Sequence, residues 1–276
     1  MHPRASHERT PPVNWTLALV SLVATCVLMA VMWLRQRRTG NAGIVDVAWA
    51  GSIGVMAVLF CALGDGWEPR RILVGALGGL WSARLTWHLF VRVSGEAEDG
   101  RYAEMRRSYG ERFDRFMVLF FAIQALLAWL LALPFLHLAA QSAEGWRVWD
   151  VLAVVLWITS IAGEAVADRQ LAAWRTNPSN KGKTCRAGLW RYSRHPNYFF
   201  EWLHWCVYPL LAVGLPWGWT LWVAPLAMLV LVTKVTGIPP TEAQSVRSRG
   251  DDYRRYQRET NAFFPGPVNT SAEANS

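Results

Sequence analysis

The chain has 276 residues, of which 53% are apolar and only 17% are charged, and it carries 17 tryptophans. A soluble domain carries about a quarter charged residues, so this composition excludes a disordered protein and argues against a soluble enzyme. A net charge of +8 would suggest nucleic-acid binding in a soluble protein. In a membrane protein the same excess is typical of basic cytoplasmic loops, so we expect no nucleic-acid partner.

Long apolar runs predict membrane-spanning helices, because about 20 helical residues cross the ~30 Å hydrocarbon layer. The sequence predicts an all-α integral membrane protein with seven transmembrane helices in one domain over 15–265. Short tails flank this domain at 1–14 and 266–276. The seven runs are Trp15–Leu34, Ile44–Leu63, Ile72–Val91, Phe116–Leu136, Val148–Ala167, Tyr198–Leu215 and Trp217–Val235.

The basic residues predict the orientation of these helices. Arg35, Arg37 and Arg38 follow the first run, whereas a cleaved secretory signal carries its basic residues before the apolar stretch. With the N-terminus outside, 21 of the 28 Lys and Arg residues fall in inner stretches and five in outer ones. The positive-inside rule therefore predicts an uncleaved N-terminus outside and a cytosolic C-terminus. In a bacterium the membrane would be the inner one, with the active site open to the cytosol.

Ionisable side chains within spans are costly and are candidates for function. Several of them share a helix face, since residues four apart lie on one side of a helix. Most fall in the cytosolic half of the predicted bilayer, which favours one cavity open to the cytosol. The alternative is isolated pairs that serve helix packing, such as Arg84 with Asp46. The residues concerned are Asp46, Arg84, His88, Glu164, Asp168, Glu201, His204 and Lys234.

The segment Arg194–Tyr198, which reads Arg-His-Pro-Asn-Tyr, predicts a helix start. Pro196 suits the first turn of a helix, and a helix N-terminus offers free N–H groups to an anion. Arg194 and His195 flank this end, which suits a pyrophosphate. The last two residues of the motif, with Glu201 one turn deeper, would face the same ligand.

Segments spread over most of the chain form a set of motifs. They are Asp46–Trp49, Glu98–Tyr102, Asp168 with Arg175, Gly188–Tyr198 with Glu201, Glu242, Asp252–Tyr253, Tyr256 and Phe263–Pro265. In these segments, from about residue 40 to residue 265, the sequence resembles the membrane steroid 5-alpha-reductase family, in its bacterial branch.

The resemblance implies a seven-helix reductase that holds NADPH from the cytosolic side. Such an enzyme reduces the double bond of a 3-oxo-Δ4 steroid by hydride transfer to the β carbon, while an acid stabilises the developing enolate. Another isoprenoid or fatty enone or enal would fit the same chemistry. We expect a small lipophilic substrate, the lipid bilayer as surroundings and a monomeric protein.

The resemblance also implies roles for particular residues. In the steroid enzymes a Glu on span 2 and a Tyr on span 3 polarise the carbonyl. This sequence offers Asp46 on span 2 and has no Tyr on span 3, so we expect catalysis by Asp46 with Arg84 or His88. No metal site is expected. The expected cofactor-binding residues are Asp168, Arg175, Lys183, Asn197, Tyr198, Glu201, Glu242 and Tyr256 by resemblance, and Arg194 and His195 from the helix-start argument.

Two other functions remain open at this point. A methyltransferase related to isoprenylcysteine carboxyl methyltransferase would share the Arg-His-Pro-x-Tyr motif and bind S-adenosylmethionine. In that group a small residue usually follows the Tyr, whereas Phe199 and Phe200 follow it here. A non-enzymatic scaffold or sterol-binding protein would have no need for polar residues at one depth.

Overall fold

The computed structural model describes residues 14–95 and 98–269. Over these residues every regular element is helical, which confirms the all-α part of the predicted fold. Most of the predicted N-terminal tail, 1–13, and residues 270–276 of the C-terminal tail lie outside the described residues.

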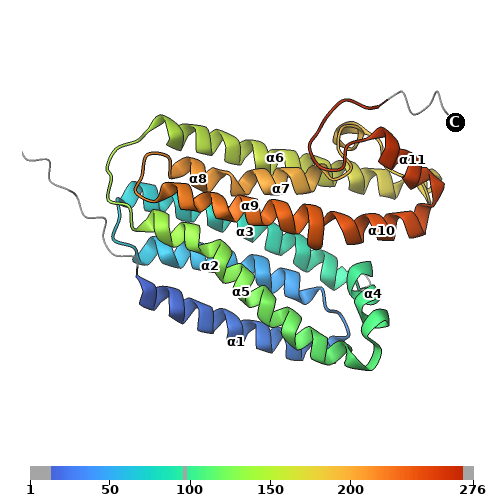
Figure 1. Cartoon of the computed structure of the whole chain (residues 1–276), viewed down its shortest axis with the longest axis horizontal. Helices are drawn as coiled ribbons and strands as arrows, with labels where there is room; N and C mark the ends of the chain where they lie inside the picture. The colour runs from blue at the N-terminus through green and yellow to red at the C-terminus, as the bar shows by residue number, and fades with distance from the viewer. Residues whose placement is uncertain (1–13, 96–97, 270–276) are drawn as a thin grey trace, which may run out of the picture. The chain divides into compact units, whose positions relative to one another are not determined.

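The chain divides into two compact units, whose helices are labelled in Figure 1. Unit 1 comprises 1–147 and 212–219, and unit 2 comprises 148–211 and 220–276. The helices of unit 1 are α1 (Trp15–Thr39), α2 (Ile44–Leu63), α3 (Glu68–Gly95), α4 (Gly100–Tyr109), η1 (Gly110–Arg112) and α5 (Phe113–Ala139).

Unit 2 is built from one long helix and a series of shorter ones. The 3₁₀ helix η4 (Gly218–Trp222) straddles the boundary between the two ranges. The remaining elements of unit 2 are α6 (Val148–Thr176), η2 (Pro178–Asn180), η3 (Gly188–Arg191), α7 (Pro196–Trp205), α8 (Val207–Leu211), α9 (Val223–Val230), the π-helix η5 (Leu231–Val235), α10 (Ile238–Arg249) and α11 (Asp251–Glu259).

Five helical segments of the described chain are long and apolar enough to cross a membrane by length and composition. They contain the first, second, fourth and fifth predicted runs and all of the seventh except its first residue, Trp217, and α2 has the bounds predicted for its run. The protein is therefore an integral membrane protein. The segments are Trp15–Thr39, Ile44–Leu63, Gly100–Ala139, Val148–Thr176 and Gly218–Arg249.

The third and sixth predicted runs differ from these five. The third run lies inside α3, which also holds arginines at both ends and in its middle. The sixth run is not one continuous helix, because α7 ends at Trp205 and α8 begins at Val207. Pro209 accounts for the interruption, since it has no N–H to donate to the carbonyl of Trp205.

Small residues bring α2 and α3 into close contact in unit 1. A Cβ atom added at Gly54 would lie 2.1 Å from the Ser82 hydroxyl oxygen, and one at Gly78 would lie 2.9 Å from the Cβ of Ala57. The Ser82 hydroxyl donates to the carbonyl of Ala50 at 2.7 Å. In lipid, where apolar surface is not driven out of water, such close backbone packing and interhelical hydrogen bonds hold helices together.

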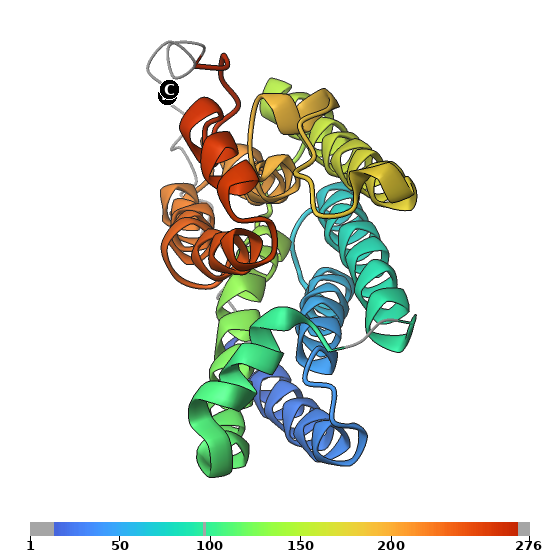
Figure 2. The ribbon, with the colours of Figure 1, turned by 90° about the vertical axis from the view of Figure 1, so that its right-hand side faces the viewer.

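The same unit buries an apolar cluster between the α1–α2 connection, α4 and α5. Tyr102 of α4 packs there with Met29 and Phe121, and all three side chains are at most 2% exposed. Figures 1 and 2 show α4, in green, across this end of the unit. The packing of α4 brings its polar residues next to the start of α2.

Unit 2 packs α6 against α7 and ties the loop between them to α6. A Cβ atom at Gly163 would lie 2.4 Å from the ring of Phe200, so α7 approaches α6 where no side chain intervenes. The indole of Trp190 in η3 donates to the carbonyl of Ala167 at 2.9 Å. These contacts fix the loop that carries the Arg194–Tyr198 motif.

Candidate functional site

The first cluster of predicted residues lies at the start of α2, in unit 1. Asp46 sits in the first turn of α2, and its carboxylate accepts hydrogen bonds from the Tyr102 hydroxyl at 2.8 Å and from the Arg101 guanidinium at 3.1 Å. Arg92 lies 4.0 Å from the same carboxylate. We call Asp46, Arg92, Asp99, Arg101 and Tyr102 the Asp46 cluster. It brings two carboxylates, a phenol and two guanidinium groups together.

Asp99 fixes the geometry of this cluster by capping α4. Its carboxylate accepts from the backbone N–H of Arg101 at 2.9 Å and from the Arg101 side chain at 3.1 Å. Burial raises the pKa of Asp99, but attraction to Arg101 and Arg92 outweighs it and lowers the pKa below its usual 3.8. The neighbouring Glu98 accepts from the backbone N–H of Ala42 at 3.0 Å, which fastens the motif to the α1–α2 connection.

Arg84 and His88, the expected partners of Asp46, lie on α3. Arg84 is half-buried and His88 is exposed. The hydrogen bonds to Asp46 come instead from Arg101 and Tyr102 of α4. Catalysis by Arg84 or His88 therefore stays a prediction, and Tyr102 is the candidate that the sequence argument missed. The Glu98–Tyr102 motif contains this residue, but the sequence alone assigns the motif no role.

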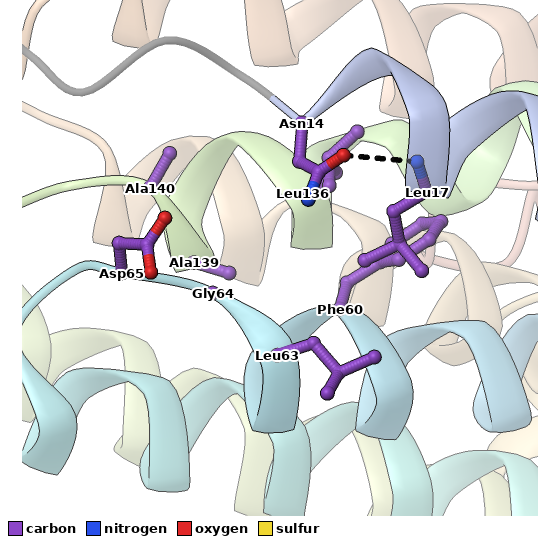
Figure 3. Close-up of a pocket in the computed structure, with 9 residues that line it drawn as sticks. All are labelled: Asn14, Leu17, Phe60, Leu63, Gly64, Asp65, Leu136, Ala139 and Ala140. Atoms are coloured by element: carbon purple, nitrogen blue, oxygen red, sulfur yellow. Dashed lines mark hydrogen bonds between the residues drawn. The ribbon is translucent and has the colours of Figure 1, made fainter.

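Unit 1 also has a shallow hollow, which Figure 3 shows between α1, α2 and α5. Its walls include Asn14, Phe60 and Leu136, and the space it encloses is about the size of one water molecule. Phe60 lies near the end of α2 opposite to Asp46, about 14 residues away, or ~20 Å at 1.5 Å per residue. The hollow is thus too small and too far from Asp46 to complete a substrate site there.

The second cluster of predicted residues lies in unit 2, around the carboxylate of Glu242 on α10. One oxygen accepts from Arg194 at 2.6 Å and from the His195 ring at 3.2 Å, and it lies 3.5 Å from the Tyr253 hydroxyl. The other oxygen accepts from the Gln257 side chain at 2.7 Å. We call these five residues the Glu242 network. It joins the start of α7 to α10 and α11.

The side chains of Arg194 and His195 form hydrogen bonds with other residues of unit 2. Arg194 also donates to the backbone carbonyls of Gln257 at 2.9 Å and Thr260 at 2.5 Å. His195 is 3% exposed. Burial lowers its pKa below the ordinary 6.5, and the hydrogen bond to Glu242 only partly opposes this. His195 is therefore neutral near pH 7 and holds the first turn of α7 in place.

Three further predicted cofactor residues meet where α6, α7 and α10 come together. The Asn197 amide donates to Asp168 of α6 at 3.3 Å. The hydroxyl of Tyr198 lies 3.3 Å from that of Thr241, the residue before Glu242 on α10. These polar groups are half-buried and line one end of α7.

The remaining predicted residues of unit 2 have different surroundings. Glu201 accepts from the indole of Trp205 at 3.2 Å, one turn further along α7. Arg175 and Lys183 are exposed, at the end of α6 and in the loop after it. Tyr256 is 1% exposed, and its hydroxyl donates to the backbone carbonyls of Trp190 and Ser193.

Tyr256 therefore braces the loop before α7, and its hydroxyl faces the backbone. Tyr253 and Gln257 lie near Tyr256 on α11, at helical spacing, and the sequence did not identify them as members of the Glu242 network. The amphipathic pattern of α11 was the available signal, since its tyrosines are buried and its arginines are exposed.

The polar residues expected to share one cavity belong to both units. Asp46, Arg84 and His88 lie in unit 1, and the other five lie in unit 2. Within unit 2, His204 is buried and its ring bonds the Tyr208 hydroxyl at 2.9 Å, whereas Lys234 is exposed on the π-helix. A single cavity for all eight stays a prediction.

Comparison with known proteins places the chain in a family. The family described as "Protein of unknown function (DUF1295)" matches residues 32–260. The "Uncharacterized protein C594.04c" of Schizosaccharomyces pombe is 28% identical over 278 residues, which cover 90% of this chain and 79% of the yeast protein. No solved structure matches the chain. Because the family match runs from α1 to the end of α11, the chain belongs to the DUF1295 family.

Proposed function

We propose that the protein uses NADPH to reduce the carbon–carbon double bond of an enone lipid, with a 3-oxo-Δ4 steroid as the favoured substrate and its 5-alpha-dihydro form as product. The hydrogen bond from Asn197 to Asp168 carries this proposal. It joins two positions that the resemblance to the steroid 5-alpha-reductases assigns to the cofactor, although they lie 29 residues apart on different helices.

The side chains around the start of α7 suit a dinucleotide. Asn197 and Tyr198 offer an amide and a phenol at a helix N-terminus, where free N–H groups and the helix dipole favour an anion. Arg175 and Lys183 add exposed cations from the end of α6 and the next loop. NADPH, when bound, would supply the hydride. Arg194 and His195 act in this proposal by fixing the position of α7 through Glu242.

The Asp46 cluster is our candidate for polarising the substrate carbonyl. Asp46 and Tyr102 form a carboxylate–phenol pair at 2.8 Å, the same two types of group that the resemblance implies for this task. The Asp46 carboxylate accepts from the phenol and from Arg101, with Arg92 4.0 Å away, so these contacts orient the phenol. Tyr102 has one O–H, which it donates to Asp46 in this structure, so in this proposal the phenol turns that O–H to the bound carbonyl oxygen and stabilises the enolate that forms on hydride addition.

We also propose seven spans, with the N-terminus outside and the C-terminus in the cytosol. At 1.5 Å per residue α3 is roughly 40 Å long, enough to cross the bilayer. The interrupted α7–α8 pair would complete the count. The excess of Lys and Arg on the inner side of this arrangement supports the orientation.

A specific contact disfavours the methyltransferase alternative. In that group the cofactor approaches the backbone just after the tyrosine of the motif, which requires a small residue. Here Phe200 fills the space beside Gly163, and the Phe199 ring packs at a tilt against Trp202 and edge-on against Phe263, at about 6 Å between ring centroids. We therefore rank the reductase first and keep S-adenosylmethionine as a ligand for the test.

The test is NADPH oxidation by the detergent-purified chain with progesterone or testosterone, followed by product mass. We expect the steroid to gain two hydrogens. Tyr102→Phe keeps the packed ring and removes the hydroxyl, so we expect turnover to fall about 10- to 100-fold, with unchanged NADPH affinity. Tyr109→Phe is the matched control, because Tyr109 lies on the same helix and is exposed.

The outcomes separate the parts of the proposal. NADPH binding without steroid reduction would retain the cofactor and reject the steroid. Binding of S-adenosylmethionine in place of NADPH would reject the reductase. Full turnover by Tyr102→Phe would remove the phenol from the mechanism.

A further inference from the structure

A group of exposed arginines lies at the end of unit 1 where α1 finishes and α5 begins, next to α4 (Figure 1). An ion pair joins the two helix ends, because the Nε atom of Arg37 lies 3.3 Å from the Asp114 carboxylate. The contact places side chains from two separate spans at one level. We call the exposed arginines around it the arginine collar, which consists of Arg35, Arg38, Arg112 and Arg115.

The collar carries more positive charge than its surroundings neutralise. None of its four arginines forms an ion pair or a side-chain hydrogen bond with another residue in the ranges 14–95 and 98–269. Asp114 is already paired with Arg37, and Glu104 is paired with Arg107 at 2.6 Å. The exposed Glu111 of η1 supplies one negative charge beside the collar. The surface thus has guanidinium groups available to an anion from outside the chain.

The collar continues the lipid-facing sides of both spans. On α1, the exposed Val31 lies one turn before Arg35, and on α5 the exposed Leu119 lies one turn after Arg115. In an integral membrane protein such exposed apolar side chains contact the acyl chains. The arginines that prolong the same helix faces therefore reach the level of the lipid headgroups, where their charged ends leave the hydrocarbon layer.

Tryptophans at the opposite end of unit 1 support this placement. Trp15 opens α1, Trp146 follows the far end of α5, and both side chains are exposed. Tryptophan is enriched where a membrane meets water. Trp15 and Arg35 are about 20 residues apart on α1, or ~30 Å at 1.5 Å per residue, which is the thickness of the hydrocarbon layer. The two ends of α1 thus match the two membrane boundaries.

We propose that the arginine collar binds the phosphate groups of anionic phospholipids, of which phosphatidylglycerol is the probe used below. A guanidinium group presents a fixed fork of donors to phosphate oxygens, and clusters of Lys and Arg beside a membrane span attract anionic lipids. Phosphatidylcholine has the same phosphate, but its ammonium group cancels the charge. The inference goes beyond the proposed reaction and depends only on the membrane-spanning fold.

The experiment is native mass spectrometry of the full chain in neutral detergent with equal amounts of phosphatidylglycerol and phosphatidylcholine that carry the same acyl chains. We expect wild type to retain phosphatidylglycerol preferentially. The double variant Arg38→Gln/Arg115→Gln removes one charge from each span. It should lower the ratio of bound phosphatidylglycerol to phosphatidylcholine roughly 10- to 30-fold. Both side chains are exposed, so the midpoint of thermal unfolding in the same detergent should not change.

Two further double variants control for charge and for folding. Arg191→Gln/Arg258→Gln removes two exposed charges from unit 2 and should keep the preference of wild type. Arg38→Lys/Arg115→Lys retains the collar charges and should keep most of the preference. Equal retention of the two lipids by wild type would overturn the inference. An equal loss of preference in the unit 2 variant would also overturn it, because net charge alone would then explain the binding.

Discussion

Glu242 shows how one carboxylate can organise residues that are far apart in the sequence. It receives hydrogen bonds from Arg194 and His195, almost fifty positions before it, and from Gln257, fifteen positions after it. An ionised carboxylate buried to this degree requires such partners, because its loss of water must be compensated. The geometry of the first turn of α7 thus depends on α10 and α11.

His195 makes the stability of this network dependent on pH. Its pKa lies below 6.5 in the folded protein because it is buried, with Glu242 opposing and Arg194 adding to the effect. As the pH falls through about 6.5, the unfolded chain takes up a proton first. The stability that neutral His195 contributes is therefore complete above about pH 6.5 and is lost as the pH falls toward the folded pKa.

We expect His195→Gln, which retains a donor for Glu242, to lose less stability on acidification than wild type does. The measurement is thermal unfolding in detergent at about pH 7.5 and about pH 5.5, on either side of the ordinary histidine pKa. His88→Gln is the control, since His88 is exposed. Equal acid sensitivity in wild type and His195→Gln would contradict the role given to His195.

At the scale of helices, the contact between α2 and α3 depends on the absence of side chains. Gly54→Ala would place a methyl group 2.1 Å from the Ser82 hydroxyl oxygen, which itself bonds α2. We expect a loss of about 1–3 kcal/mol, typical of overpacking, seen as a lower midpoint of thermal unfolding in detergent.

A matched substitution is available one turn earlier on α2. A Cβ atom at Gly51 would meet the Thr86 side chain at 3.5 Å, an ordinary contact distance. Gly51→Ala should therefore be neutral or stabilising by up to ~1 kcal/mol, as alanine is in a helix interior. If both variants behaved alike, the α2–α3 contact would not depend on Gly54.

Helices were the part of the fold that the sequence predicted best. The bounds of α2 and the first residue of α6 match the predicted runs, because hydrophobic length alone defines them. The interruption at Cys206 was missed, since hydropathy ignores the hydrogen bond that Pro209 cannot make. The π-helix over Leu231–Val235 was likewise invisible, because it changes the hydrogen-bond register and not the composition.

The candidate site was predictable only in part. The Arg194–Tyr198 motif gave the helix start at Pro196, because proline and helix geometry are local properties. The hydrogen-bond partners are far apart in the sequence. Tyr102 and Asp46 are separated by 56 positions, and Glu242 and Arg194 by 48. Without information on packing, the sequence indicated candidate residues but could not predict which of them form hydrogen bonds with one another.

At the scale of the whole molecule, the predicted orientation is open to a direct test. Reporters fused at the two ends of the full chain should be found on opposite sides of the membrane, with the C-terminal reporter active in the cytosol. This follows from an odd number of spans and the inner excess of Lys and Arg. Both reporters on one side would mean an even number of spans and would contradict the seven-helix arrangement.

The loop before α7 is completed by the last part of the described chain. Gly266 donates its N–H to the carbonyl of Tyr192, and Ser193 donates to the carbonyl of Phe263. These bonds close loops of about 70 residues, whose entropic cost is met only when the later segment is present. During synthesis on the ribosome, the first turn of α7 is therefore made before the contacts that set its geometry exist. Synthesis must reach Gly266 before this region acquires its final form, and a chain that stops before Glu242 would leave Arg194 without its acceptors.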